Sequence, residues 1–307
     1  MSQTLKIAAF LGGMLICQSA LAGKLAIVID DFGYRPKEEN QVLQLPAPLS
    51  VAVLPDATHA RQMAIKAHQT GHEVLIHLPM APLSKQPLEK NTLTPDMSSD
   101  QIARIIQLAV QHVPYAVGLN NHMGSKMTSS LPGMIKVMQV LNHYNFYFLD
   151  SMTIGNSQSI PASKGTHVRV LKRNVFLDDT QNDADIRKQF LRAIALARRN
   201  GSAIAIGHPH PATVRVLQQM LANLPADITL VRPSQLLNES PLSSQGNAAM
   251  TQNTHSGTKK HVPAVSDLTQ QCRTTQKLTP PPPSQGVSII YNSVKNSQFI
   301  RDLRTLF

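Results

Sequence analysis

The sequence is poor in cysteine and has no long apolar segment, and each of these two shortages excludes a class of protein. Its 307 residues include two cysteines, Cys17 and Cys272, and no tryptophan. Two cysteines are too few for a disulfide-rich scaffold. An apolar core must therefore stabilise the fold. No stretch reaches the roughly 20 consecutive apolar residues of a transmembrane helix. The composition therefore indicates a globular protein without a membrane-spanning segment.

The first residues have the pattern of a secretory signal peptide. Lys6 precedes an apolar run from Ile7 to Ile16, and the small residues of Ala20-Leu21-Ala22 follow it. A positive start, a short apolar middle and small residues at the cut site are typical of a cleaved export signal. Cleavage after Ala22 would leave Gly23 as the first residue of a soluble periplasmic protein with no stable membrane anchor. The alternative is that this segment stays on the chain as an anchor.

Basic residues outnumber acidic ones, with 29 Lys and Arg against 18 Asp and Glu, for a net charge of +11. The excess is spread along the chain, and no basic helix or run dominates it. An exported protein with this pattern is not expected to bind nucleic acid. The charge instead favours attraction to an anionic polymer of the cell envelope.

The composition changes near residue 238. Ser, Gln, Asn, Thr and Pro dominate from there to residue 307, and the segment includes the run Pro280 to Pro283. Such a segment cannot bury enough apolar area to offset the entropy lost on ordering, so a disordered tail is predicted over 238–307. Residues 23–237 are long enough for one domain of barrel size.

Short apolar runs alternate with amphipathic stretches throughout residues 23–237. The predicted strands are 25–29, 49–54, 73–78, 116–119, 146–149, 168–171 with 175–177, 203–206 and 228–231. The predicted helices are 57–70, 98–112, 132–143, 183–200 and 213–223. This order predicts an α/β fold with a mostly parallel sheet, open or closed into a barrel. In such folds the reactive groups gather at the carboxyl ends of the strands.

Polar residues follow almost every predicted strand. The strand at Leu25–Ile29 is followed by Asp30 and Asp31, which taken alone could also begin a turn before Gly33. The other strands lead into His77, into Asn120, Asn121 and His122, into Asp150 and Ser151, into Asp178 and Asp179, and into His208 and His210. Carboxylate oxygen and imidazole nitrogen suit zinc or a similar divalent metal. The pattern therefore predicts one metal site at this end of the sheet.

Several of these stretches together resemble the divergent polysaccharide deacetylase family, which is related to carbohydrate esterases of the NodB type. The resemblance covers nearly all of residues 24–237 and rests on the stretches 29–33, 71–80, 118–125, 148–151, 175–178 and 205–209. It implies a distorted (β/α) barrel of about seven strands. It also implies a metal-dependent hydrolase that removes acetyl groups from an N-acetylated envelope glycan, with peptidoglycan as one candidate.

The resemblance also implies a set of metal ligands. Asp31 corresponds to a ligand, and His77 to the first histidine of the family's His-x-x-x-His pair. The second histidine of that pair would fall at Ala81, which cannot bind a metal. His122, at the end of the next strand, is the predicted substitute. The implied cofactor is one divalent ion, with zinc the leading candidate.

The remaining roles also follow from the resemblance. Asp30 corresponds to the general base and His208 to the general acid that protonates the departing nitrogen. Asp150 is expected to orient a ligand or to set the tautomer of His208. The candidates for contacts with substrate or with these groups are Asn121, Asp150, Ser151, Asp178 and His210.

Two other functions remain open at this point. Because Ala81 replaces a ligand, the barrel could serve as a non-catalytic glycan-binding or scaffold protein. A glycosidase would need two spaced carboxylates, such as Asp30 with Asp150 or Asp178, and no metal between them.

Overall fold

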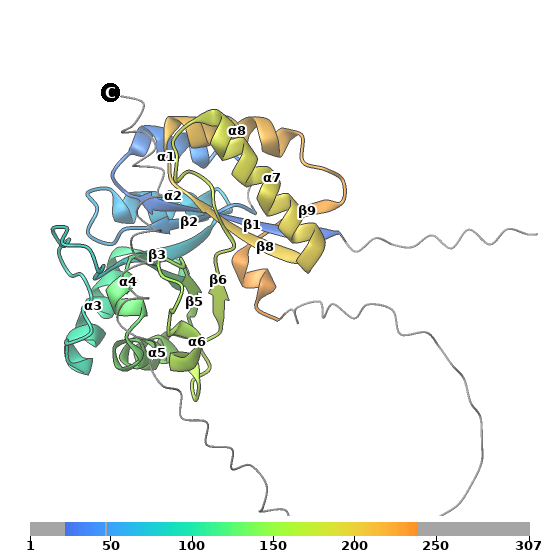
Figure 1. Cartoon of the computed structure of the whole chain (residues 1–307). Coiled ribbons are helices and arrows are strands. Elements are labelled where there is room, and N and C mark those ends of the chain that lie inside the picture. Colours follow the sequence, from blue (N-terminus) through green and yellow to red (C-terminus); the bar gives the residue numbers. More distant parts are fainter. Residues whose placement is uncertain (1–21, 47, 239–307) are drawn as a thin grey trace, which may run out of the picture. The chain divides into compact units, whose positions relative to one another are not determined.

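The computed structural model describes residues 22–46 and 48–238 (Figure 1). The predicted signal peptide and the predicted C-terminal tail lie outside these ranges, apart from Ala22 and Asn238. Among the helices in these ranges, none combines the length and apolar character that a membrane crossing requires.

The described chain forms one parallel sheet. Its nine strands are β1 (Gly23–Phe32), β2 (Ser50–Val53), β3 (Glu73–Met80), β4 (Ala116–Met123), β5 (Tyr147–Asp150), β6 (Val170–Lys172), β7 (Val175–Phe176), β8 (Ser202–Gly207) and β9 (Ile228–Val231). Their order is β6-β5-β4-β3-β2-β1-β8-β7, and β9 pairs with the first half of β1. Each strand sits beside its neighbours in parallel, as the alternation of strands and helices predicts.

The sheet is strongly curled. Only Arg173 and Asn174 separate β6 from β7, although these two strands lie at opposite ends of the strand order. Two residues cannot span a flat sheet of this width, because an extended residue covers only about 3.5 Å. The two ends must therefore approach each other, and the predicted distorted (β/α) barrel is confirmed.

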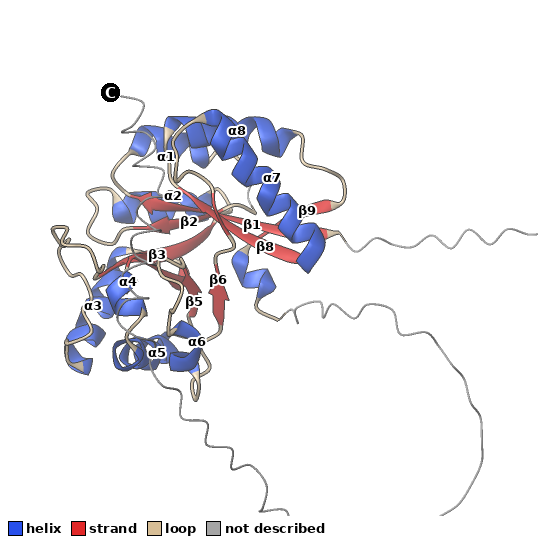
Figure 2. Ribbon diagram, viewed as in Figure 1, coloured by secondary structure: helices blue, strands red, loops and turns tan. Residues whose placement is uncertain are grey.

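Helices cover the outer face of the sheet (Figure 2). They are α1 (Pro36–Val42), α2 (Ala60–Gln69), α3 (Ser99–His112), α4 (Ser125–Thr128), α5 (Leu131–Tyr144), α6 (Ser159–Ser163), α7 (Asp183–Asn200) and α8 (Pro211–Ala222), with a final 3₁₀ turn at Pro233–Leu236. A capping box begins α3, where the side chains of Ser98 and Gln101 each accept a hydrogen bond from the other's backbone amide. The short helices α1, α4 and α6 were not predicted, because helices of this length show too little hydrophobic periodicity.

Alternate residues of each strand face two different cores. In β1, Leu25 and Ile27 pack outward among the helices, whereas Ala26 and Val28 point into the barrel. The inner core continues with Ala52, Leu75, Tyr147, Leu149, Ile204, Ile206, Val231 and Leu236. Every second residue of a strand therefore faces the barrel interior, and this alternation determines which polar side chains lie inside the barrel at the carboxyl ends of the strands.

Candidate active site

The inward positions carry polar side chains where the strands end. The next inward residue after Val28 is Asp30, after Leu75 is His77, and after Ile206 is His208. On β4 the same face carries Asn120 and His122. The period of two along each strand thus gathers residues from four strands into one cluster.

Asp31 reaches the same cluster by a local change of backbone. Strict alternation would turn its side chain outward, away from Asp30. Its φ of 59° lies in the left-handed region, which is uncommon for a residue with a side chain. At this point β1 advances from Ile29 to Phe32 while β2 advances only from Val51 to Val53, so β1 contains an irregularity of one extra residue. This bulge re-aims Asp31 toward the barrel mouth.

Asp31, His77 and His122 form a compact set of metal-ligand atoms. The Oδ1 atom of Asp31 lies 3.0 Å from His122 Nδ1 and 3.2 Å from His77 Nε2, and the two nitrogens are 3.1 Å apart. All three atoms are close enough to share one ion. Asp31 Oδ1 is buried and has no hydrogen-bond partner among the described residues. A buried carboxylate oxygen in this condition is costly, and a cation bound between the three atoms would satisfy it.

Asn120 orients His77 for this role. The Nδ2 group of Asn120 donates to Asp30 Oδ1 at 2.8 Å, so its Oδ1 atom faces His77 and accepts from His77 Nδ1 at 2.8 Å. When His77 is neutral, as a metal ligand must be, its proton is therefore on Nδ1, and the lone pair of Nε2 then points toward Asp31 and His122. The close approach follows from strand register, because His77 on β3 lies opposite Asn120 on β4.

Glu89 lies beside the distal nitrogen of His122, as Asn120 lies beside that of His77. Its Oε1 atom lies 3.3 Å from His122 Nε2, which leaves Nδ1 of this ring facing Asp31. A carboxylate on the distal nitrogen of a metal-binding histidine sets the tautomer and makes the ligand more basic. Glu89 was not among the predicted site residues, because it lies in the segment between β3 and α3, where no strand-end pattern marks it.

Ala81 takes part in backbone hydrogen bonds between three segments and offers no side-chain ligand to a metal. Its side chain is buried, its amide donates to Leu93 O, and its carbonyl accepts from the amides of Lys126 and Met127. His122 lies one strand away, opposite Pro79. The predicted substitution of His122 for the missing histidine is thus consistent with the geometry.

The two adjacent carboxylates have different electrostatic environments. Asp30 is 2% exposed, and burial raises its pKa against the opposing charges of His77 and His208. Burial also acts to raise the pKa of Asp31, but the imidazoles of His122 and His77 outweigh it and hold that pKa well below its usual range. Asp31 is therefore suited to bind a cation, whereas Asp30 is a stronger proton acceptor.

His208 lies across the cluster and is held by Asp178. Its Nδ1 atom is 3.0 Å from Asp178 Oδ1, and its backbone amide donates to Asp178 Oδ2 at 2.7 Å. Burial lowers the pKa of His208, but the hydrogen bond and charge of Asp178, assisted by Asp31 and Asp30, outweigh this effect and raise it to about 9. Nε2 of the ring lies 3.8 Å from Asp31 Oδ2, so it faces the cluster. His208 is thus a protonated group beside the ligand set.

Asp178, His208 and His210 are also close enough to share an ion. Both oxygens of Asp178 are already hydrogen bonded. Its Oδ1 atom pairs with His208 Nδ1, and its Oδ2 atom accepts from Thr213 Oγ1 and from the His208 amide. This group is therefore satisfied without a cation, in contrast to the one around Asp31.

The predicted role of Asp150 in setting the tautomer of His208 is wrong. Tyr147 and Leu149 point into the barrel, so Asp150 turns outward. Its carboxylate accepts hydrogen bonds from the hydroxyls of Ser157 and Ser159 and from the Met152 amide. Asp150 stabilises the loop after β5, and Asp178 carries out the predicted function instead.

The other predicted polar residues lie around the cluster. Asn121 accepts from the Ser151 amide and donates to the Met123 carbonyl, so it ties the ends of β4 and β5 together. Ser151 Oγ is 3.5 Å from Asn120 Nδ2. His210 lies at the rim, 5.7 Å from His208 between ring centroids.

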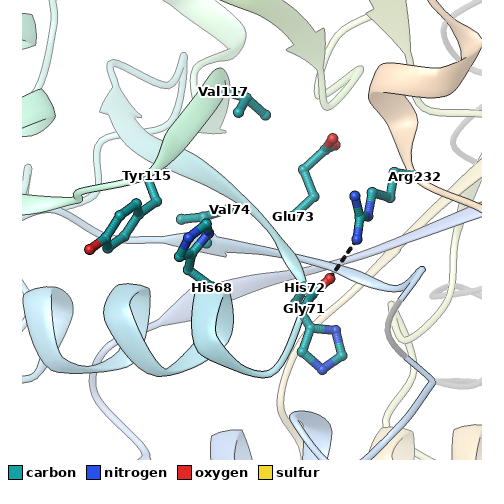
Figure 3. Close-up of a pocket in the computed structure, with 8 residues that line it drawn as sticks. All are labelled: His68, Gly71, His72, Glu73, Val74, Tyr115, Val117 and Arg232. Carbon is teal, nitrogen blue, oxygen red and sulfur yellow. Dashed lines mark hydrogen bonds between the residues drawn. The ribbon is translucent and has the colours of Figure 1, made fainter.

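The cluster opens into a cavity of about 310 Å³, lined by Asp31, Tyr34, Arg35, Leu54, Glu89, His122, His208, Pro209 and His210. A second hollow of about 280 Å³ lies at the opposite ends of β3 and β4, where His68 stacks on Tyr115 and Arg232 donates to the Gly71 carbonyl (Figure 3). His72, which also lines it, has Nδ1 2.8 Å from the carbonyl oxygen of Leu49 and Nε2 3.2 Å from the carbonyl oxygen of Leu43. The chemistry-bearing residues therefore belong to the first cavity.

Comparison with known proteins gives one family and several relatives. Residues 27–237 match the family described as divergent polysaccharide deacetylase. An uncharacterized protein of Escherichia coli K12, YibQ, is 72% identical over 233 residues, which are 76% of this chain and 73% of that protein. An uncharacterized Haemophilus influenzae protein is 46% identical over 208 residues, 68% of this chain and 74% of its own length. The crystal structure of the uncharacterized Agrobacterium tumefaciens protein ATU2773 shares the fold, with a TM-score of 0.66 and 20% identity over 70% of this chain and 89% of that one.

Proposed function

This chain belongs to the divergent polysaccharide deacetylase family, and we propose that it is a metal-dependent hydrolase that removes acetyl groups from an N-acetylated envelope glycan. The observation that carries the proposal is the buried Oδ1 atom of Asp31, which lies between His77 and His122 and has no hydrogen bond within the described part of the chain. Beside it lie a buried carboxylate, Asp30, and a histidine with a raised pKa, His208. A binding protein has no use for a base and an acid on either side of a metal site.

The donor set fits a divalent ion, and zinc is the proposed one. One carboxylate and two imidazoles are a common zinc ligand set, and three protein ligands leave a position for water. When bound, the ion would polarise the acetamide carbonyl and lower the pKa of the attacking water. Asp31, His77 and His122 would hold it, with Asn120 and Glu89 fixing the two rings.

The proton transfers are assigned to the two residues that flank the ligand set. Asp30 takes the proton of the attacking water, and its pKa, raised by burial, makes it a better base than an exposed aspartate. The Nε2–H group of His208 faces the cluster and donates a proton to the departing nitrogen. Asn120 keeps Asp30 in place by donating to its Oδ1 atom.

The cavity suits a carbohydrate. Tyr34 lines it and is 51% exposed, so its ring offers an apolar face with a polar tip at the entrance. A sugar presents a similar mixture of C–H and hydroxyl groups.

His122→Ala is expected to reduce bound metal well below one ion per chain, because it removes one of three ligands. His143→Ala is the matched control, since His143 is exposed on α5 and lies outside the cluster. Elemental analysis of both purified proteins after zinc loading gives the measurement. Full occupancy in His122→Ala would contradict this ligand set.

Asp178→Asn is expected to lower the pKa of His208 from about 9, because Asp178 is the main group that raises it. His208 acts in its protonated form, so activity is lost as pH rises through its pKa. The loss should therefore begin at lower pH in the variant. NMR titration of the imidazole signals in metal-free protein measures the pKa of His208. Asp179→Asn, at the exposed neighbouring residue, is the control and should leave this pKa unchanged.

We also propose that the chain is exported to the periplasm with its signal peptide cleaved. N-terminal sequencing of the protein from an envelope fraction is expected to begin at Gly23, the first residue of β1. A start at Met1 or Ser2 in membranes would favour the uncleaved anchor.

A non-catalytic glycan-binding role is the second candidate, and Ala81 is the observation that favours it. The test is acetate release from several N-acetylated glycans with zinc, cobalt or manganese supplied. Glycan binding without acetate release under every condition would replace the enzyme with the binding protein.

A further inference from the structure

Arg35 is a cation at the active-site cavity whose charge no carboxylate of the described residues neutralises. It follows β1, lines the cavity with Asp31, His122 and His208, and forms no ion pair with an acidic side chain among residues 22–46 and 48–238. The acidic groups of the cavity are engaged elsewhere, since Asp31 faces the two histidines and Glu89 faces His122. The positive charge is therefore available to a ligand.

Arg35 is also held in place at both its backbone and its side chain. Glu39, fully buried in α1, accepts hydrogen bonds from the Gly33 and Arg35 amides at 2.8 and 2.6 Å. The Nη1 group of Arg35 donates to His210 Nδ1 at 3.0 Å. Two loops of the barrel mouth, after β1 and β8, thus contribute to the orientation of one guanidinium.

This arrangement leaves the rest of the guanidinium free to bind. No described residue accepts a hydrogen bond from its Nε or Nη2 groups. Burial is the main effect that lowers the pKa of His210, which keeps that ring neutral and able to accept from Arg35. A planar guanidinium fixed beforehand loses little entropy when it binds, and its parallel N–H groups match a carboxylate or a phosphate.

We propose that Arg35 recognises an anionic group, a carboxylate or a phosphate, on the N-acetylated sugar that enters this cavity. The inference rests on the proposed function, because it concerns the substrate of the same site. It predicts that the enzyme distinguishes acidic from neutral N-acetylated sugars. It also assigns Glu39 and His210 as positioning residues for Arg35.

The test uses N-acetylglucosamine oligomers in three forms: unmodified, with a 3-O-lactyl carboxylate, and with a 6-phosphate. Acetate release and calorimetric binding are measured on the full, zinc-loaded protein and on Arg35→Gln, which removes the charge. Arg104→Gln is the matched control, because Arg104 is exposed on α3 and does not line the cavity. At least one acidic form should exceed the unmodified oligomer in kcat/KM and in affinity by about tenfold or more, and Arg35→Gln should abolish this preference.

Each outcome separates the two proposals. A preference for the carboxylate or for the phosphate identifies which anion the site takes. Equal kcat/KM for all three forms, or a preference that survives in Arg35→Gln, overturns the role of Arg35 and leaves the deacetylase intact. If no form releases acetate, the proposed function fails, but the binding data still test the role of Arg35. Tighter binding of an acidic form that is lost in Arg35→Gln supports the recognition of an anion by Arg35. Equal binding of the three forms overturns that role.

Discussion

Asp30→Asn is expected to reduce acetate release about a hundredfold to ten-thousandfold while the metal stays bound. The substitution keeps the shape of the side chain, and the new amide oxygen can still accept from Asn120 Nδ2, which donates to Asp30 Oδ1 at 2.8 Å. It removes the basicity that the mechanism needs. Asp30 is not among the three ligand atoms around Asp31 Oδ1, so metal affinity should change little.

The measurement pairs the kcat of acetate release with the metal content of the same sample. Asp100→Asn, on the exposed first turn of α3, is the matched control for an aspartate-to-asparagine change. Loss of metal together with activity in Asp30→Asn would mean that Asp30 is a ligand, and an unchanged kcat would mean that another group is the base.

His208→Ala is expected to produce a loss of similar size, and the loss should depend on the leaving group. His208 donates a proton to the departing nitrogen, and a poor leaving group needs that proton most. A series of N-acyl substrates whose amines differ in basicity gives the measurement. The difference between the wild-type protein and His208→Ala should grow with amine basicity.

A structural role of His208 would give a different result. If the side chain only supported the loop after β8, its removal would lower the rates for all leaving groups equally. His210→Ala is the comparison, because His210 lies at the rim and is assigned the positioning of Arg35 but no proton transfer, so any loss that it causes should be the same for all leaving groups. A uniform loss across the series would overturn the assignment of His208 as the acid.

Sequence alone was sufficient for the fold class, because hydrophobic periodicity is a local property. The runs around Val28, Leu75 and Ile206 mark strands, and helices between them require parallel pairing. The same pattern predicted that polar residues after the strands would meet at one end. Strand boundaries were less accurate: β1, β3 and β4 continue to Phe32, Met80 and Met123, because their last residues keep the ladder while directing polar side chains inward.

The tertiary structure decided which of the polar residues belong to the site. Alternation counted from Leu149 turns Asp150 away from the barrel, and Asp178 rather than Asp150 reaches His208. The sequence pattern included Asn120 without giving it a role, although it lies two residues before His122 and therefore on the same face of β4. Its link between His77 and Asp30, however, depends on strand register, which no local pattern specifies.

Two features of the site depend entirely on the folded chain. The left-handed backbone of Asp31 exists because β1 bulges against β2, so adjacent aspartates that should face opposite ways share one mouth. Glu89 and Arg35 come from loops, where the sequence carries no period and position follows from packing against distant residues. The sequence determined which chemical groups the strands deliver, and the tertiary structure decided their distances and partners, because these depend on contacts between segments far apart in the chain.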